Sequence, residues 1–344
     1  KNPHPEWGSG PYKVDQFDYN SGTATFVPNE KWWGEKAKLD KVTYRRMELQ
    51  AAINAFQSGE IDATVVSDKD RLAVAKSLKD VNIQGTLQPT HWVLTANSKA
   101  PNLEDVKVRE ALFTGINRET LAQIRFNGLG YKENLPGSFV MFQNQKGYED
   151  NFGSVVQYDQ AKAKQLLDDA GWAIGSNGIR EKDGEKLTLR YVTFGDDNQG
   201  KSMAAATQKM LKDIGVDLQI SERPGSDFSK VVANLDFDFL TSGITSYDPY
   251  GVMYFKYTYG SDSQVNKSGT GTPELDEQIA ELEKLPTQEE QIQKANELEK
   301  EAFKQYGIMP YANGPRLVAS KKTLANYGAL AFAVVPKENI GWAK

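Results

Sequence analysis

Cysteine is absent from this chain of 344 residues. Without a thiol, the chain has no disulfide, no cysteine nucleophile and no thiolate ligand for a metal ion. Histidine is also scarce, since only His4 and His91 occur, and a histidine-rich metal site is therefore excluded. These absences remove several of the side chains on which catalysis and metal binding most often depend.

Long apolar runs are missing too, and no segment has the length that a membrane-spanning helix needs. The formal charge is −5, and its 41 basic and 46 acidic residues are mixed along the chain. Nucleic-acid-binding proteins concentrate lysine and arginine on one face, so nucleic acid is not expected as a partner. A composition of 39% apolar and 25% charged residues is typical of globular proteins, and the length predicts two lobes.

No signal peptide or lipid-attachment motif precedes Lys1. The segment 2–7 contains two prolines and has the composition of an interior loop, so we expect the chain to be part of a longer polypeptide. The alternative is a leaderless cytosolic protein.

The first quarter of the chain has the alternating pattern of antiparallel strands, expected at 11–17, 23–28 and 42–47. Helices are expected at 49–58 and 68–78, the second beginning at an Asp cap, with strands at 61–66 and 81–84.

From residue 91 on, strands alternate with helices, which predicts βαβ units and a largely parallel sheet. The stretch 128–153 is rich in glycine, asparagine and phenylalanine and is expected to be a long surface excursion. The expected strands are 91–97, 187–194, 216–221, 237–243, 308–311 and 316–318, and the expected helices are 104–117, 118–126, 158–170, 201–214, 227–235, 274–285 and 288–305.

Motifs for catalysis are weak. The pattern Gly269-x-Gly271 lacks the third glycine and the strand–helix context of a nucleotide loop. Paired carboxylates such as Asp168-Asp169 occur, but a glycosidase needs two carboxylates held across a cleft, and most such pairs lie on solvated faces. Enzymatic activity is therefore not expected.

A polar loop follows the strand that ends at Gly243. It contains Thr245, Ser246, Tyr247 and Asp248, whose hydroxyls, carboxylate and backbone amides are suited to hold a small solute. In open α/β sheets, ligands bind in the crevice beyond the carboxyl ends of the strands. The alternative interpretation is an ordinary Asp-Pro turn.

Several sequence blocks follow one another in a fixed order: Gly10-Pro-Tyr-Lys13, Trp33-Gly34, Leu39–Val42, Ala55–Asp62, Asp105–Leu112, Ile116–Glu119, Gln157–Leu167 and Ala170-Gly-Trp172. Taken in this order, they resemble the solute-binding proteins of bacterial peptide and nickel ABC importers, the extracellular family 5. The resemblance implies an α/β, periplasmic-binding-protein-like fold (type II-like) with two lobes, one complete and one partial. The partial lobe would comprise 1–92, the complete lobe 93–307, and the return to the first lobe 308–344.

The resemblance also implies a function. The chain is expected to be the extracytoplasmic solute-binding component of an ABC importer, lipid-anchored in its full-length form, monomeric, and without a cofactor. Strands 91–97 and 308–311 would cross between the lobes. Trp92 and Tyr311 would face the cleft, and Thr245, Ser246, Tyr247 and Asp248 would supply polar contacts.

One departure from the family pattern concerns the solute. Gly243-Ile244 stands where peptide-binding relatives usually have Gly-Trp, and the Asp that pairs with a peptide amino group is not at its usual place. An oligopeptide is the first expectation, and a modified peptide, a glycan, a lipid-linked solute or a metal chelate remains open. Two further alternatives are a transport-inactive homologue that regulates envelope glycan or lipid biosynthesis by protein contact, and a hydrolase of envelope glycans.

Overall fold

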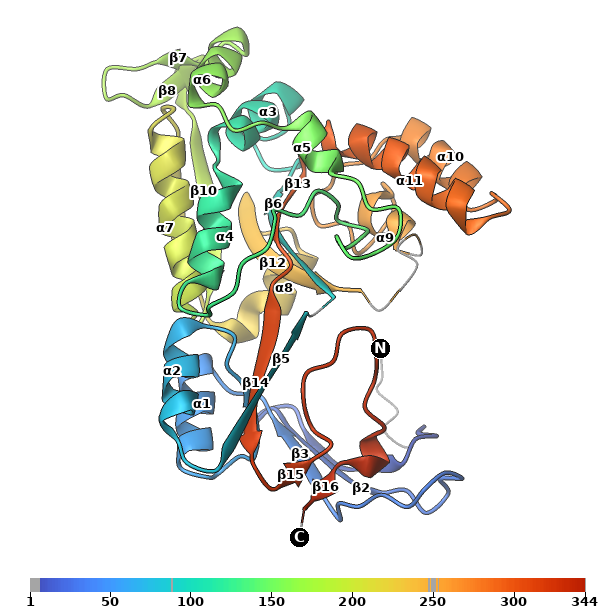
Figure 1. The fold of residues 1–344 in the computed structure, drawn as a ribbon. Coiled ribbons are helices and arrows are strands. Elements are labelled where there is room, and N and C mark those ends of the chain that lie inside the picture. Colours follow the sequence, from blue (N-terminus) through green and yellow to red (C-terminus); the bar gives the residue numbers. More distant parts are fainter. Residues whose placement is uncertain (1–6, 88, 247, 249–251, 253, 344) are drawn as a thin grey trace. The chain divides into compact units, whose positions relative to one another are not determined.

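The computed structural model describes residues 7–87, 89–246, 248, 252 and 254–343, and it divides into two compact units (Figure 1). Unit 1 comprises residues up to 88 together with those from 315 on, and unit 2 comprises residues 89–314. The chain therefore leaves unit 1 once and returns to it once. The functional lobes expected at 1–92, 93–307 and 308–344 stay a prediction.

Unit 1 is built from antiparallel strands and short helices. Its sheets have the orders β1–β2–β3, β4–β14–β5 and β15–β16. In the second sheet, β14 pairs with β5 along its whole length, from Pro315 opposite Leu87 to Lys321 opposite Val81. The elements are β1 (Tyr12–Asp18), β2 (Thr23–Pro28), β3 (Val42–Arg45), α1 (Leu49–Gln57), β4 (Ala63–Val65), α2 (Lys69–Ser77), β5 (Val81–Leu87), β14 (Pro315–Lys321), β15 (Leu324–Ala325), η2 (Lys337–Asn339) and β16 (Gly341–Trp342).

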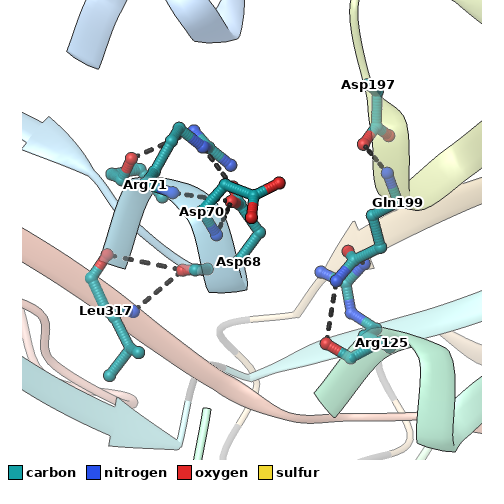
Figure 2. A network of polar contacts seen from close by, with 9 residues as sticks. Asp68, Asp70, Arg71, Arg125, Asp197, Gln199 and Leu317 are labelled. Atoms are coloured by element: carbon teal, nitrogen blue, oxygen red, sulfur yellow. Dashed lines mark hydrogen bonds and ion pairs between the residues drawn. The ribbon is translucent and has the colours of Figure 1, made fainter. Parts of the chain in front are cut away.

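The start of α2 is tied to the sheet that it covers (Figure 2, left). As the sequence predicts, Asp68 is the cap, and its side chain accepts hydrogen bonds from the backbone N–H groups of Asp70 and Arg71. Next to it, the Ser67 hydroxyl accepts a hydrogen bond of 2.9 Å from the backbone N–H of Leu317 in β14. One turn of chain therefore both begins the helix and fixes it to a strand that lies 250 residues away in the sequence.

Unit 2 is organised around a five-stranded sheet with the order β11–β10–β12–β6–β13. The prediction of a largely parallel sheet is wrong for one of its strands, because β6 runs antiparallel to both β12 and β13, which themselves run in the same direction. The pairs β10–β11 and β10–β12 are parallel, because crossover helices connect these strands. Strand β6 instead receives the chain as it arrives from unit 1.

Helices cover this sheet, and α4 and α7 run alongside each other on one side of it (Figure 1). The elements of unit 2 are β6 (Thr90–Ala96), α3 (Val106–Gly115), α4 (Arg118–Phe126), α5 (Asn151–Val155), α6 (Gln160–Asp169), β7 (Ala173–Ile174), β8 (Arg180–Lys182), β9 (Glu185–Lys186), β10 (Thr188–Phe194), α7 (Asn198–Lys212), β11 (Asp217–Arg223), η1 (Gly225–Asp227), α8 (Phe228–Ala233), β12 (Phe239–Thr245), α9 (Phe255–Tyr259), α10 (Pro273–Leu282), α11 (Gln288–Phe303) and β13 (Ile308–Ala312).

The segment 128–153 is not the surface excursion that its composition predicts. Phe139, Val140 and Met141 in its middle are buried in the core of unit 2. The segment is fixed there by Glu299 of α11, whose carboxylate accepts a hydrogen bond of 2.9 Å from the backbone N–H of Phe139. Glycine and asparagine correctly mark turns in this stretch, but four consecutive apolar residues at 139–142 are enough to bury its centre.

Candidate functional site

The polar loop predicted after β12 begins at the edge of the sheet of unit 2. The hydroxyls of Thr245 and Thr90 are 2.8 Å apart, so the end of β12 is joined to the beginning of β6. The backbone N–H of Ser246 donates to the carbonyl of Pro89 at 2.8 Å. Ser246 and Asp248 are both buried, and the Ser246 hydroxyl accepts a hydrogen bond of 3.3 Å from the N–H of Asp248. Tyr247 lies outside the described residues.

Trp92 of β6 lies across its neighbour β12. It is opposite Gly243 in the strand register, and its indole ring occupies the space where a side chain at position 243 would be. A Cβ atom built on Gly243 would be 2.8 Å from Cζ3 of the Trp92 ring. Glycine is therefore required at this position for the ring to lie flat on the sheet.

Arg125, in the last turn of α4, stacks on that ring. Its guanidinium carbon is 3.2 Å from the centroid of the Trp92 ring. Gln199 of α7 forms two hydrogen bonds with the same arginine. Its Oε1 accepts from Nη1 of Arg125 at 2.9 Å, and its Nε2 donates to the Arg125 carbonyl at 2.8 Å. Figure 2 (right) shows this pair together with Asp197, the cap of α7, whose carboxylate accepts from the N–H of Gln199.

The charge of Arg125 is buried, since only 9% of the residue is exposed. Burial lowers the pKa of Arg125, and the nearby groups Tyr311, Asp197 and Glu133 partly oppose this shift. The Tyr311 hydroxyl lies beside the guanidinium, and burial raises the pKa of Tyr311 to about 12 although the Arg125 charge acts to lower it. Tyr311 is therefore a neutral hydroxyl at physiological pH.

Glu133 fixes the chain where it leaves unit 2. Its carboxylate accepts from the backbone N–H of Asn313 at 2.6 Å and from the N–H of Gly314 at 3.0 Å. The Tyr131 hydroxyl donates to the same carboxylate at 2.8 Å. The Glu133 carboxylate thus accepts hydrogen bonds from three groups of this chain.

His91 does not have the environment of a general base. It is fully buried, it stacks on Phe142 with ring centroids 3.9 Å apart, and burial lowers its pKa to about 3. The side-chain N–H of Asn313 lies 3.2 Å from Nδ1, so Nδ1 accepts and the proton of the neutral ring is on Nε2. His91 is accordingly uncharged at physiological pH.

The structure thus brings two of the six predicted residues, Trp92 and Tyr311, together around Arg125. Thr245, Ser246 and Asp248 lie at the end of β12 in the same unit. Sequence reasoning missed Arg125, although one signal was present: Arg125 lies four residues after Leu121, on the buried face of α4. It also missed Gln199 and Glu133, whose partners are distant in the sequence.

In the part of the chain that the structure describes, no three His, Cys, Asp or Glu side chains are grouped as ligands for a metal ion. No helix in that part of the chain is both long enough and apolar enough to cross a membrane.

Comparison with known proteins places this architecture among binding proteins. Residues 2–266 match the bacterial extracellular solute-binding proteins, family 5, in the middle region of that family. The oligopeptide-binding protein OppA of Mycobacterium tuberculosis (strain H37Rv) is 32% identical over 343 residues, which are 98% of this chain and 56% of that protein. This chain therefore spans little more than half the length of that relative.

Two solved structures have the same fold. The oligopeptide-binding protein AppA of Bacillus subtilis, in complex with a nonapeptide, superimposes with a TM-score of 0.81 at 22% identity, covering 98% of this chain and 67% of that one. The periplasmic EDTA-binding protein EppA also has a TM-score of 0.81, at 24% identity, covering 97% of this chain and 64% of that one.

Proposed function

The chain belongs to the bacterial extracellular solute-binding proteins of family 5, and on this basis we propose that it is the solute-binding component of an ABC importer. Its solute is an oligopeptide or a small solute of similar size, bound outside the cytoplasm and passed to a permease in the membrane. Binding and release proceed by closing and opening of two lobes.

The observation that carries this proposal is the cluster of Trp92, Arg125 and Tyr311 in unit 2. An aromatic face, a guanidinium and a neutral hydroxyl are groups that hold polar solutes of varied shape. Two members of the cluster, Trp92 and Tyr311, lie on β6 and β13, the strands through which the chain enters and leaves unit 2. Trp92 pairs with Ala312 in that ladder, only a few residues from either crossing, so a change in the crossing segments acts directly on the cluster.

The polar loop after β12 supports the same function. Thr245, Ser246 and Asp248 lie at the carboxyl end of a strand that is central in the sheet, where ligands of α/β proteins bind. We propose that these three residues, with Tyr247, contact the solute alongside Trp92 and Tyr311.

Relatives suggest two classes of solute. One solved neighbour is described with a nonapeptide and another as an EDTA-binding protein, so peptides and metal chelates are the two classes to test first.

The second sheet of unit 1, in which β14 and β5 pair throughout, supplies the other pair of adjacent strands at the crossings. We propose that these paired segments act as the hinge.

A thermal-shift screen of the full chain tests the function. The panel contains a random peptide library and Fe(III)–EDTA, each at a large excess. A solute at a hundredfold excess over its dissociation constant stabilises the folded state by about 2.7 kcal/mol, which raises the melting temperature by several degrees. Binding is then compared between Trp92→Ala and Trp33→Ala, because Trp33 is an exposed tryptophan of unit 1 (77%) and serves as a matched control.

We expect Trp92→Ala to lose at least tenfold in affinity, on the order of the value of one stacked aromatic contact, and Trp33→Ala to bind like the wild type. Equal affinities of the two variants would contradict the proposed site. If no solute shifts the melting temperature, and a pulldown recovers an envelope biosynthetic enzyme rather than a permease, the regulatory alternative replaces the transport function.

A further inference from the structure

Building on the proposed solute-binding function, we propose that Arg125 binds a carboxylate group of the solute and that unit 2 thereby selects solutes with a free carboxylate. The function alone does not specify this chemical class, since peptides can be amidated or esterified and metal chelates can be uncharged. Four features of the described residues support it.

The first feature is a buried cation without a direct ion pair. Arg125 is nine-tenths buried, and its side-chain hydrogen bond among the described residues goes to the amide oxygen of Gln199 rather than to a carboxylate. A charge removed from water is costly unless it is paired and fully hydrogen-bonded. Another buried arginine of unit 2, Arg109, meets this requirement by donating to three backbone carbonyls at 2.7–3.0 Å.

The second feature is the engagement of the nearby carboxylates. Asp197 and Glu133 are near enough to influence the pKa of Arg125, but their hydrogen bonds go to other groups. Asp197 accepts from the N–H of Gln199 as the cap of α7, and Glu133 accepts from two backbone N–H groups and from Tyr131. The two acids therefore offset the charge of Arg125 only from a distance, without a direct ion pair.

The third feature is the geometry of the guanidinium. Stacking on Trp92 uses a flat face of the group, and the bond to Gln199 uses Nη1. A guanidinium has five N–H donors in its plane, and stacking on a flat face does not use them. The donors at the edge of a guanidinium are the ones through which arginine binds a carboxylate by two parallel hydrogen bonds.

The fourth feature is a second donor. The Tyr311 hydroxyl is buried, has no hydrogen-bond partner among the described residues and lies near the guanidinium. A hydroxyl next to a cation favours an anionic ligand, because both groups can donate hydrogen bonds to it.

A purely structural role is the competing explanation. In that case Arg125 only bridges Trp92 and α7, and its substitution weakens every solute by the same factor. The ratio of the affinities for an acid and for its neutral analogue distinguishes the two roles. A residue that only bridges Trp92 and α7 affects both affinities equally, because it does not contact the charged group of the ligand.

The experiment measures affinity by calorimetry for two matched pairs of ligands on the full chain. One pair is a peptide from the library with a free C-terminus and the same peptide as the C-terminal amide. The other is Fe(III)–EDTA and a ferric complex of an uncharged trihydroxamate. The pairs distinguish a peptide carboxylate from a chelator carboxylate. The variants are Arg125→Gln, Arg125→Lys and, as the control, Arg190→Gln, which removes a partly exposed arginine of the same unit.

The wild type is expected to prefer the acid in at least one pair by tenfold or more, the effect of about one hydrogen bond to a charged group. Arg125→Gln should reduce that preference to about twofold or less, Arg125→Lys should keep part of it, and Arg190→Gln should keep all of it. The preference is also measured on the wild type alone, so a variant that fails to fold leaves the proposal testable.

Two results overturn the inference while the solute-binding function stands. One is equal affinity of the wild type for acid and neutral analogue in both pairs. The other is an equal loss of both ligands in Arg125→Gln, which assigns Arg125 a positioning role. Absence of binding by the wild type in both pairs and in the thermal-shift panel overturns the function and the inference together.

Discussion

Arg180 and Arg125 are both buried in unit 2, and their surroundings differ. Arg180 of β8 is 1% exposed and donates to three backbone carbonyls, those of Ile214, Trp172 and Lys164, at 2.5–3.0 Å. It also forms an ion pair with Asp168 at 2.5 Å. Arg125 is 9% exposed, and the neighbours of its side chain among the described residues are one amide oxygen, one aromatic face and the Tyr311 hydroxyl.

This difference indicates why each charge is buried. The donors of Arg180 satisfy one carbonyl within α6, one between α6 and β7 and one just after α7, so removing the side chain leaves several acceptors without this partner. Arg125 satisfies far fewer groups of its own protein. A buried ion that stabilises the fold has most of its donors used internally, whereas a buried ion intended for a ligand keeps some of them unused.

The largest expected effect tests this contrast directly. Arg180→Met should lower the free energy of unfolding by about 3–5 kcal/mol, because it removes a buried charge whose partners stay behind. Arg125→Met should lower it by about 1 kcal/mol or less, because methionine fills the space and only one amide loses its donor. Urea denaturation of the full chain measures both.

Asp168→Asn provides the control for the first variant. Its side chain is 59% exposed, so loss of the ion pair alone should cost less than about 1 kcal/mol. If Arg180→Met is no more destabilising than Arg125→Met, the distinction between a structural and a ligand-directed arginine is lost.

Much of the fold was predictable from local signals. Helix α4 is found with the predicted bounds Arg118–Phe126, and α2 begins at the predicted cap Asp68. These predictions succeed because periodicity and capping depend on residues three or four positions apart. The direction of β6 and the burial of 139–142 depend on contacts with distant segments, and neither is encoded locally.

The candidate site divides in the same way. Trp92 was predicted because an aromatic near a chain crossing resembles the family pattern. Arg125 was not predicted, because a charged residue at the end of a helix is ordinarily solvated, and only the approach of Trp92 and Gln199 makes this one buried. A site formed by three distant elements cannot be read from any one of them.

A smaller effect concerns the platform on which Arg125 stacks. Gly243→Ala places a Cβ atom 2.8 Å from Cζ3 of Trp92, so the ring must tilt or move off the sheet. We expect a loss of about 1–3 kcal/mol in unfolding free energy, the usual cost of overpacking. In a Trp92→Leu background the same substitution should cost much less, because the ring is gone.

The double-mutant cycle of these two substitutions gives their coupling free energy by urea denaturation. A coupling near zero would show that the cost of a side chain at position 243 does not depend on the Trp92 ring. The same variants, tested with a bound solute, report whether a displaced ring also loosens Arg125.

The smallest effect extends the comparison to a buried acid, Glu299 of α11. Its carboxylate accepts from the Phe139 N–H at 2.9 Å, from Asn151 at 2.8 Å and from the Tyr259 hydroxyl at 2.8 Å, and burial nevertheless raises its pKa. The pKa of Glu299 in the folded state lies above the unfolded value of about 4.3. The Glu299 side chain therefore makes its full contribution to the free energy of unfolding below about pH 4.3. It decreases as pH rises toward the folded-state pKa, by about 1.4 kcal/mol for each unit of the shift.

Glu299→Gln has no such titration, so the free energy of unfolding of the wild type should fall relative to this variant between about pH 4 and neutrality. Urea midpoints of both proteins at several pH values measure the difference. Glu297→Gln, on the same helix with a side chain that is 58% exposed, should follow the wild-type pH dependence. If Glu299→Gln follows it as well, the three hydrogen bonds fully compensate the buried charge, and Glu299 then resembles Arg180, whose partners also come from its own chain, rather than Arg125.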